Sequence, residues 1–221
     1  MSETLESYSA PAAQIHSPIV RWLAKIVSFV FHPLFIPVFV TLFLLYAHPI
    51  MFAGYSDVMK YRLTATIFVN LAMLPAITVL LCWRLNFVDS IYMNTQKERI
   101  IPLAAAMIFY FWGWFVLKNN SGIPDIFKEF LLGCFITIIA GWLSNIAFKV
   151  SLHGLAMGGM FCFILLLTFR SEGLGAQYVA FAALVAGLVC SMRLVLNTHR
   201  PFEVYFGFLL GALSQVVALV L

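Results

Sequence analysis

Residues 100–117 read IIPLAAAMIFYFWGWFVL, which is eighteen consecutive positions without a charged side chain. A helix needs about 20 predominantly apolar residues to cross the hydrocarbon core of a bilayer. Backbone groups in lipid must be paired within the spanning structure, so only helices and closed barrels cross it. Barrel strands alternate apolar and polar residues over about ten positions, whereas this run is continuously apolar. It therefore predicts a transmembrane helix.

The rest of the chain repeats this pattern. The chain has 221 residues, of which 63% are hydrophobic and 10% charged, whereas a soluble domain carries roughly 25% charged residues. The sequence predicts an all-α polytopic transmembrane bundle of seven helices, or six if the third and fourth pack as a partial hairpin. Residues 21–221 form its single domain, behind a flexible polar tail at 1–20. The further apolar runs cover residues 22–47, 63–83, 126–148, 152–169, 176–196 and 201–221.

Three local features refine this prediction. His32-Pro33 and Pro37 lie inside the first run and predict a kink. Asp57, Lys60 and Arg62 place a loop before the second run. Glycine pairs four residues apart, 154 with 158 and 207 with 211, predict close helix packing, because small residues at this spacing let helices approach one another.

Polar residues at membrane depth are rare and mark candidate functional sites. They gather in three groups, and two predicted helices separate each group from the next, so all three are expected on one face of the membrane. The groups are Lys97 and Arg99; Lys149, Ser151 and His153; and Arg193, His199, Arg200 and Glu203.

This inventory favours phosphate chemistry. Arginine presents a planar fork that matches phosphate oxygens, and helix N-termini, as predicted near Ser151 and Pro201, attract anions. A histidine can form a covalent intermediate, and a second histidine can act as general acid. Glu203 follows His199 by four residues, so one helical turn would let its carboxylate orient the imidazole.

Residues 193–207, RLVLNTHRPFEVYFG, resemble the third signature of the type-2 phosphatidic acid phosphatase family. That signature is Ser-Arg, five residues, His, three residues, Asp; here Met192 precedes Arg193, and Glu203 stands for Asp. Residues 150–154, VSLHG, resemble the second signature, Pro-Ser-Gly-His. Residues 97–102, KERIIP, resemble a compressed first signature, Lys, six residues, Arg-Pro.

The resemblance covers residues 97–207 and implies a metal-independent lipid phosphatase with a similar helical core and no cofactor. It implies that His199 attacks phosphorus, His153 protonates the leaving oxygen and Glu203 orients His199. The implied phosphate-binding residues are Lys97, Arg99, Ser151 and Arg193. The partners would be a lipid phosphate and the surrounding membrane lipids, and the implied place is a bacterial inner membrane with the site on its exoplasmic side.

Other polar residues receive simpler interpretations. Lys149 and Arg200 match no position of the signatures and are expected to contact headgroups, and His32 and His48 are expected to be interfacial. The net charge of +4 is too scattered for a nucleic-acid surface.

Two alternative functions are compared with the phosphatase interpretation. A membrane prenyl- or phosphotransferase needs clustered aspartates for Mg²⁺, and Asp57, Asp89 and Asp125 are too far apart in the sequence to supply them. A catalytically inactive relative that binds headgroups, transports or acts as a scaffold stays open, although anion binding alone needs no pair of histidines.

Overall fold

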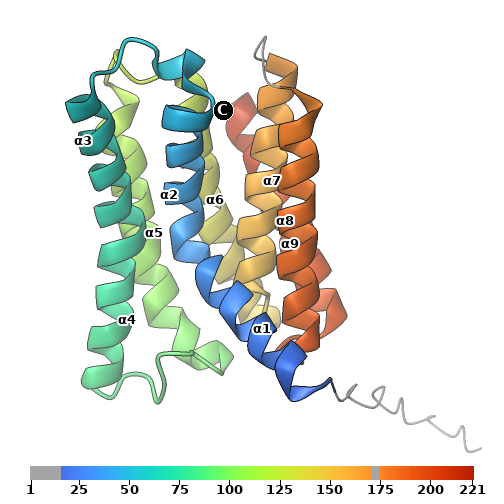
Figure 1. Ribbon diagram of the computed structural model, residues 1–221. Helices are drawn as coiled ribbons and strands as arrows, with labels where there is room; N and C mark the ends of the chain where they lie inside the picture. The colour runs from blue at the N-terminus through green and yellow to red at the C-terminus, as the bar shows by residue number, and fades with distance from the viewer. Residues whose placement is uncertain (1–15, 171–174) are drawn as a thin grey trace, which may run out of the picture.

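The structure is a computed structural model and describes residues 16–170 and 175–221. Throughout these residues the regular elements are helical and form one upright bundle (Figure 1). Seven of its helical segments are long and apolar enough to cross a membrane, so the chain is an integral membrane protein. The seven segments are Pro18–Ala47, Asp57–Arg84, Gln96–Lys118, Asp125–Ala147, Leu152–Arg170, Ala176–Val195 and Pro201–Val220.

The first two segments are interrupted, whereas the last five are single helices α5 to α9. The first is made of α1 (Pro18–Val30), the 3₁₀ turn η1 (Pro33–Phe35), α2 (Ile36–Leu42) and the π-helical η2 (Phe43–Ala47). The second is made of α3 (Asp57–Ile67), the π-helical η4 (Phe68–Met73) and α4 (Leu74–Arg84). The predicted kink at His32-Pro33 is confirmed, because α1 ends just before it.

Helix boundaries differ from the prediction where helices extend into polar sequence. Helix α3 begins at Asp57 rather than after Arg62, because the Ser56 side chain accepts a hydrogen bond from Met59 N and caps the helix. Helix α1 begins at Pro18, inside the predicted tail, and Ser17 caps it. The rest of that tail, residues 1–15, lies outside the described residues.

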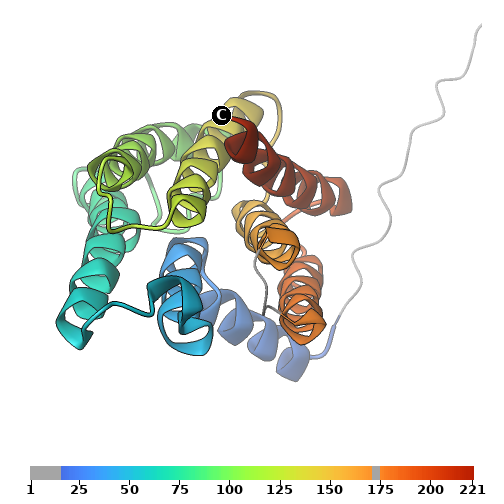
Figure 2. The ribbon, with the colours of Figure 1, turned by 90° about the horizontal axis from the view of Figure 1, so that it is seen from above.

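Helix α7 is the most buried of the seven segments, and it packs between α8 and α9 (Figure 2). The predicted glycine packing is confirmed here. A Cβ atom at Gly154 would lie 2.6 Å from the Val204 carbonyl oxygen, and one at Gly207 would lie 2.8 Å from the Ser151 carbonyl oxygen. Because the two backbones touch at these positions, the start of α7 is fixed directly against the start of α9.

Candidate functional site

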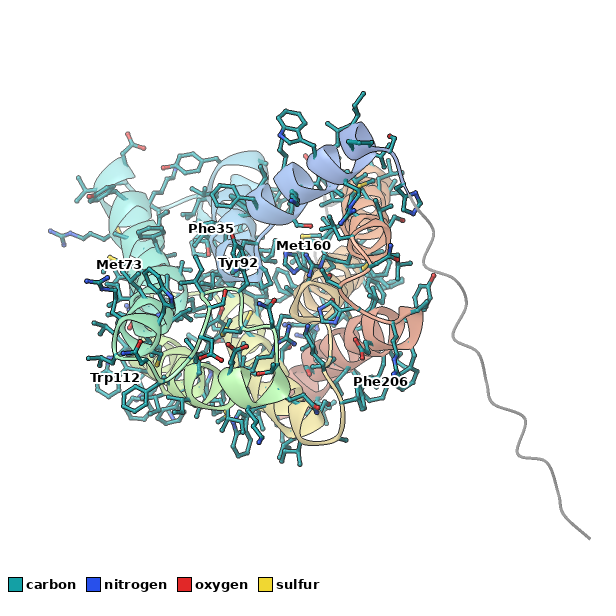
Figure 3. The ribbon with its side chains drawn as sticks, turned by 90° about the horizontal axis from the view of Figure 1, so that it is seen from below. Phe35, Met73, Tyr92, Trp112, Met160 and Phe206 are labelled. Carbon is teal, nitrogen blue, oxygen red and sulfur yellow. The ribbon has the colours of Figure 1, made fainter. Side chains whose placement is uncertain are left out.

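The residues predicted to form a site come from helix ends at the lower end of the bundle in Figure 1. Helices α5, α7 and α9 begin there, and α6 and α8 end there. Figure 3 looks onto this end, where Tyr92 of the loop between α4 and α5 lies near the middle of the bundle and Trp112 at its edge. The three polar groups therefore lie on one face, as the number of crossings predicts.

His199 is buried, and the hydrogen bonds of its ring fix its tautomer. Its Nδ1 atom lies 2.9 Å from Glu203 Oε2 and 3.1 Å from the backbone oxygen of Lys149. Both partners are acceptors, so Nδ1 carries the proton and donates to them. In the neutral ring Nε2 then holds a free electron pair, which is the form that a nucleophile or base requires.

Besides the hydrogen bond with His199, two hydrogen bonds with the main chain hold Glu203 in place. Pro201 opens α9, and Glu203 in its first turn accepts a hydrogen bond from the backbone N–H of Arg200, at 3.2 Å. The backbone oxygen of Glu203 accepts from Ser151 N at 3.1 Å, which ties α9 to the start of α7. Asn197, with φ at 53°, turns the chain between α8 and α9.

The environment of His199 favours its neutral form. Burial lowers the pKa of His199 to about 4, an effect that the hydrogen bond to Glu203 opposes and nearby Arg99 and Arg193 reinforce. The pKa of an exposed histidine is about 6.5. The unfolded chain therefore takes up a proton first as the pH falls, so His199 contributes stability above pH about 6.5 that is lost towards pH 4.

We expect His199 to remain the neutral Nδ1–H tautomer at pH 5.5, where an exposed histidine is largely protonated. Nitrogen NMR of the protein labelled with ¹⁵N-histidine measures this directly, and His199→Asn identifies the signal. The reference is His16, which precedes α1 and is not one of the site residues. A His199 ring that is already protonated at pH 5.5 would contradict the prediction.

His153 lies at the start of α7 and is buried. Its Nε2 atom lies 2.9 Å from the backbone oxygen of Ser28 in α1. A carbonyl oxygen only accepts, so Nε2 carries a proton and Nδ1 is the atom that can gain or lose one. His153 interacts electrostatically with His199 and Arg193, so the structure brings both predicted histidines together.

Arg193 is the cation best placed to receive an anion. Its Nη2 donates to Thr198 Oγ1 at 2.8 Å, while its buried Nε has no hydrogen-bond partner. It interacts electrostatically with His153, His199 and Arg99. Its side chain is half-buried, and within the described residues no carboxylate forms an ion pair with it, so an anion that joined it would offset the cost of its partial desolvation.

Arg99 is also buried at this site, but part of its guanidinium is already bound. Its Nη1 donates to the backbone oxygen of Val150 at 2.7 Å, and its Nε donates to that of Met93 at 3.2 Å. These bonds hold the loop before α5 against the start of α7. Arg99 therefore supplies positive charge and order, with only its remaining N–H groups available for a ligand.

Two of the four predicted phosphate-binding residues, Ser151 and Lys97, differ in their setting from Arg99 and Arg193. Ser151 is fully buried, and its hydroxyl accepts from Gly154 N at 3.2 Å, so it caps α7. The Lys97 side chain is exposed and lines a separate surface hollow with Phe87, Asp89 and Thr95. The structure does not bring Lys97 to the histidines.

Two residues that the sequence interpretation left outside the site belong to it. Lys149 interacts electrostatically with Arg99, Glu203 and Arg193, and burial, followed by repulsion from Arg99, lowers its pKa. The ring of His32 packs edge-on against His153, with centroids 5.7 Å apart. Lys149 stands two residues before Ser151, and this spacing in the sequence is a signal that Lys149 lies near the site. Nothing in the sequence links residue 32 to residue 153.

Comparisons of the chain with protein-family models, with curated proteins and with solved structures found no match. Among the described residues, no three histidine, cysteine, aspartate or glutamate side chains gather as a metal site would require. The function is therefore inferred from the arrangement of the site. This arrangement consists of two histidines of defined tautomer, one carboxylate and three buried or half-buried cations.

Proposed function

We propose that the protein is a membrane lipid phosphatase that hydrolyses a lipid phosphomonoester or diphosphate through a phosphohistidine at His199. One observation carries the proposal. Glu203 and the Lys149 backbone oxygen hold the His199 proton on Nδ1, which leaves Nε2 without a proton in a cluster that also contains Arg193, a half-buried arginine whose Nε has no hydrogen-bond partner. A nucleophile without a proton beside an anion receptor is what phosphoryl transfer to a side chain requires.

The first step forms the covalent intermediate. Nε2 of His199 attacks phosphorus, and the bond between phosphorus and the lipid oxygen breaks. His153, protonated on Nδ1 as well as Nε2, gives its Nδ1 proton to that oxygen, and the lipid alcohol or lipid monophosphate leaves. Glu203 stabilises the positive charge that His199 gains.

The second step releases phosphate. Water attacks the phosphohistidine while His153 Nδ1 takes a proton from it. The electron pair of the P–N bond returns to His199 Nε2, and inorganic phosphate departs. Arg193, with charge from Lys149 and Arg99, stabilises the negative oxygens in both steps.

The membrane setting favours a lipid substrate. The site lies among helix ends whose outer surfaces are apolar, so a substrate held in the bilayer reaches it with its headgroup already at the right depth. Phosphatidic acid, phosphatidylglycerol phosphate, a polyprenyl diphosphate and a lipid A phosphate all fit this description. We place the site on the exoplasmic face of a bacterial inner membrane.

The test is phosphate release by the purified protein in detergent from a panel of lipid mono- and diphosphates, without added metal. We expect Arg193→Gln to lower turnover by about 100-fold, since it removes a charge-assisted contact to the phosphoryl group. Lys97→Gln is the matched control, because its side chain lies on the same face outside the cluster, and we expect less than about a threefold change.

A folded wild type that releases no phosphate from any lipid would overturn the proposal. The second candidate, a headgroup-binding protein without turnover, would then be favoured, since Arg99 already bonds two backbone carbonyls and Ser151 already caps a helix. In that case Arg193→Gln would weaken lipid-phosphate binding, while His199→Asn would leave it nearly unchanged.

A further inference from the structure

We propose that His32 binds the substrate, donating its Nε2–H to an oxygen on the leaving-group side of the phosphoryl group. This inference rests on the proposed function and adds a residue that none of the three signatures contains. It makes the first transmembrane segment, which those signatures leave out, a wall of the site.

The position of His32 follows from the break in the first segment. Helix α1 ends at Val30, and His32 caps the 3₁₀ turn that Pro33 opens. Its Nδ1 accepts a hydrogen bond from Leu34 N at 3.4 Å. Since Nδ1 accepts, the neutral ring carries its proton on Nε2 and presents a donor.

Contacts place His32 next to the proposed general acid. Its ring lies 5.7 Å from that of His153, and α1 also supplies the Ser28 backbone oxygen that holds His153 Nε2. His153 interacts electrostatically with both His32 and His199, and Arg193 interacts with all three rings. All three histidines therefore lie within electrostatic reach of one cation, Arg193.

The order of these residues assigns His32 to one side of the reaction. In-line displacement puts the nucleophile and the leaving oxygen on opposite sides of phosphorus. His199 occupies the nucleophile side, and His153 the leaving side. Because His32 packs against His153, its Nε2–H would meet the leaving oxygen of a monoester or the next phosphate of a diphosphate.

Two substitutions separate this role from that of a helix cap. In His32→Asn the side-chain oxygen can still accept from Leu34 N, but no donor reaches the Nε2 position. In His32→Gln the amide N–H reaches that position. With an alkyl phosphate substrate we expect kcat/KM to fall about 10- to 100-fold in His32→Asn, the range for a lost hydrogen bond to a charged group, and less than about threefold in His32→Gln.

The leaving group provides a readout that a structural role would not change. With an aryl phosphate, whose oxygen leaves readily without help, the loss in His32→Asn should shrink to less than about threefold. His16→Gln, at the start of the described chain, is the control and should match the wild type with both substrates. The assignment would be overturned if kcat/KM fell equally for both substrates in both His32 variants. It would also be overturned if kcat/KM fell in neither variant.

A measurement on the wild type alone covers the case in which the asparagine variant does not fold. Vanadate bound in the site should slow modification of His32 by diethyl pyrocarbonate, followed by mass spectrometry, but not that of His16. Unchanged modification of His32 while His199 is protected would overturn the assignment of His32 alone. A wild type that releases no phosphate from either substrate would overturn the proposed function, and this inference with it.

Discussion

Replacing His199 with asparagine is expected to lower turnover of lipid phosphates by about 10⁴-fold, because the variant lacks the attacking atom. Asparagine is the sharpest substitution here, since its amide N–H can occupy the place of Nδ1–H and still donate to Glu203 and the Lys149 backbone oxygen. Packing at the start of α9 is then preserved. Phosphate release and rapid-quench capture of acid-labile phosphate on the protein measure the two steps.

Glu203→Gln is the informative companion. The amide keeps a similar shape but carries no negative charge, so the positive charge on His199 during the reaction loses its stabilisation. We expect a loss of about 100-fold in kcat, smaller than that for His199→Asn. A His199→Asn variant that is folded and retains more than about a tenth of wild-type turnover would rule out His199 as the nucleophile.

Gly158→Leu is expected to give the largest loss of stability. A Cβ at this position would collide with the backbone of Phe208, whose carbonyl carbon would lie 2.6 Å away. Neither backbone can move without separating α7 from α9, so we expect the free energy of unfolding to fall by about 3 kcal/mol or more. Thermal unfolding in detergent and the fraction of monodisperse protein on size exclusion measure the effect.

The matched control is Gly187→Leu in α8. A Cβ at Gly187 meets nothing within 4 Å, so the larger side chain enters open space. We expect this variant to unfold within a few degrees of the wild type and to keep its activity. If both variants unfold at the same temperature, the close approach of α7 and α9 does not limit stability.

The number of helices was predictable because each apolar run matches the thickness of a bilayer. Boundaries were harder, since hydropathy registers charge and misses capping. Helix α5 begins at Gln96, four residues before the apolar run, because Thr95 and Glu98 form a reciprocal capping box. The spacing Thr-x-x-Glu is visible in the sequence and could have placed this boundary.

The candidate site was predictable where neighbours in sequence are neighbours in space. His199 and Glu203 meet because His199 lies two residues before α9 and Glu203 lies in the first turn of that helix. Lys97 and Arg99 show the limit of such reasoning, because two residues along a helix differ by about 200° in direction. Arg99 therefore points into the bundle while Lys97 points outward, and only the packing of α5 decides which of them enters.

The partners that set the proton positions of the three histidines are largely main-chain atoms: the oxygens of Lys149 and Ser28 and the nitrogen of Leu34. A main-chain carbonyl oxygen is the same whatever residue supplies it, and a main-chain N–H is supplied by every residue except proline. Side chains at positions 28, 34 and 149 are therefore free to diverge without disturbing the tautomers, provided that the backbone path is kept. Alanine scanning would not detect these contacts. Replacing the peptide bond after residue 149 with an ester weakens its carbonyl as an acceptor, and it would expose this hidden contribution.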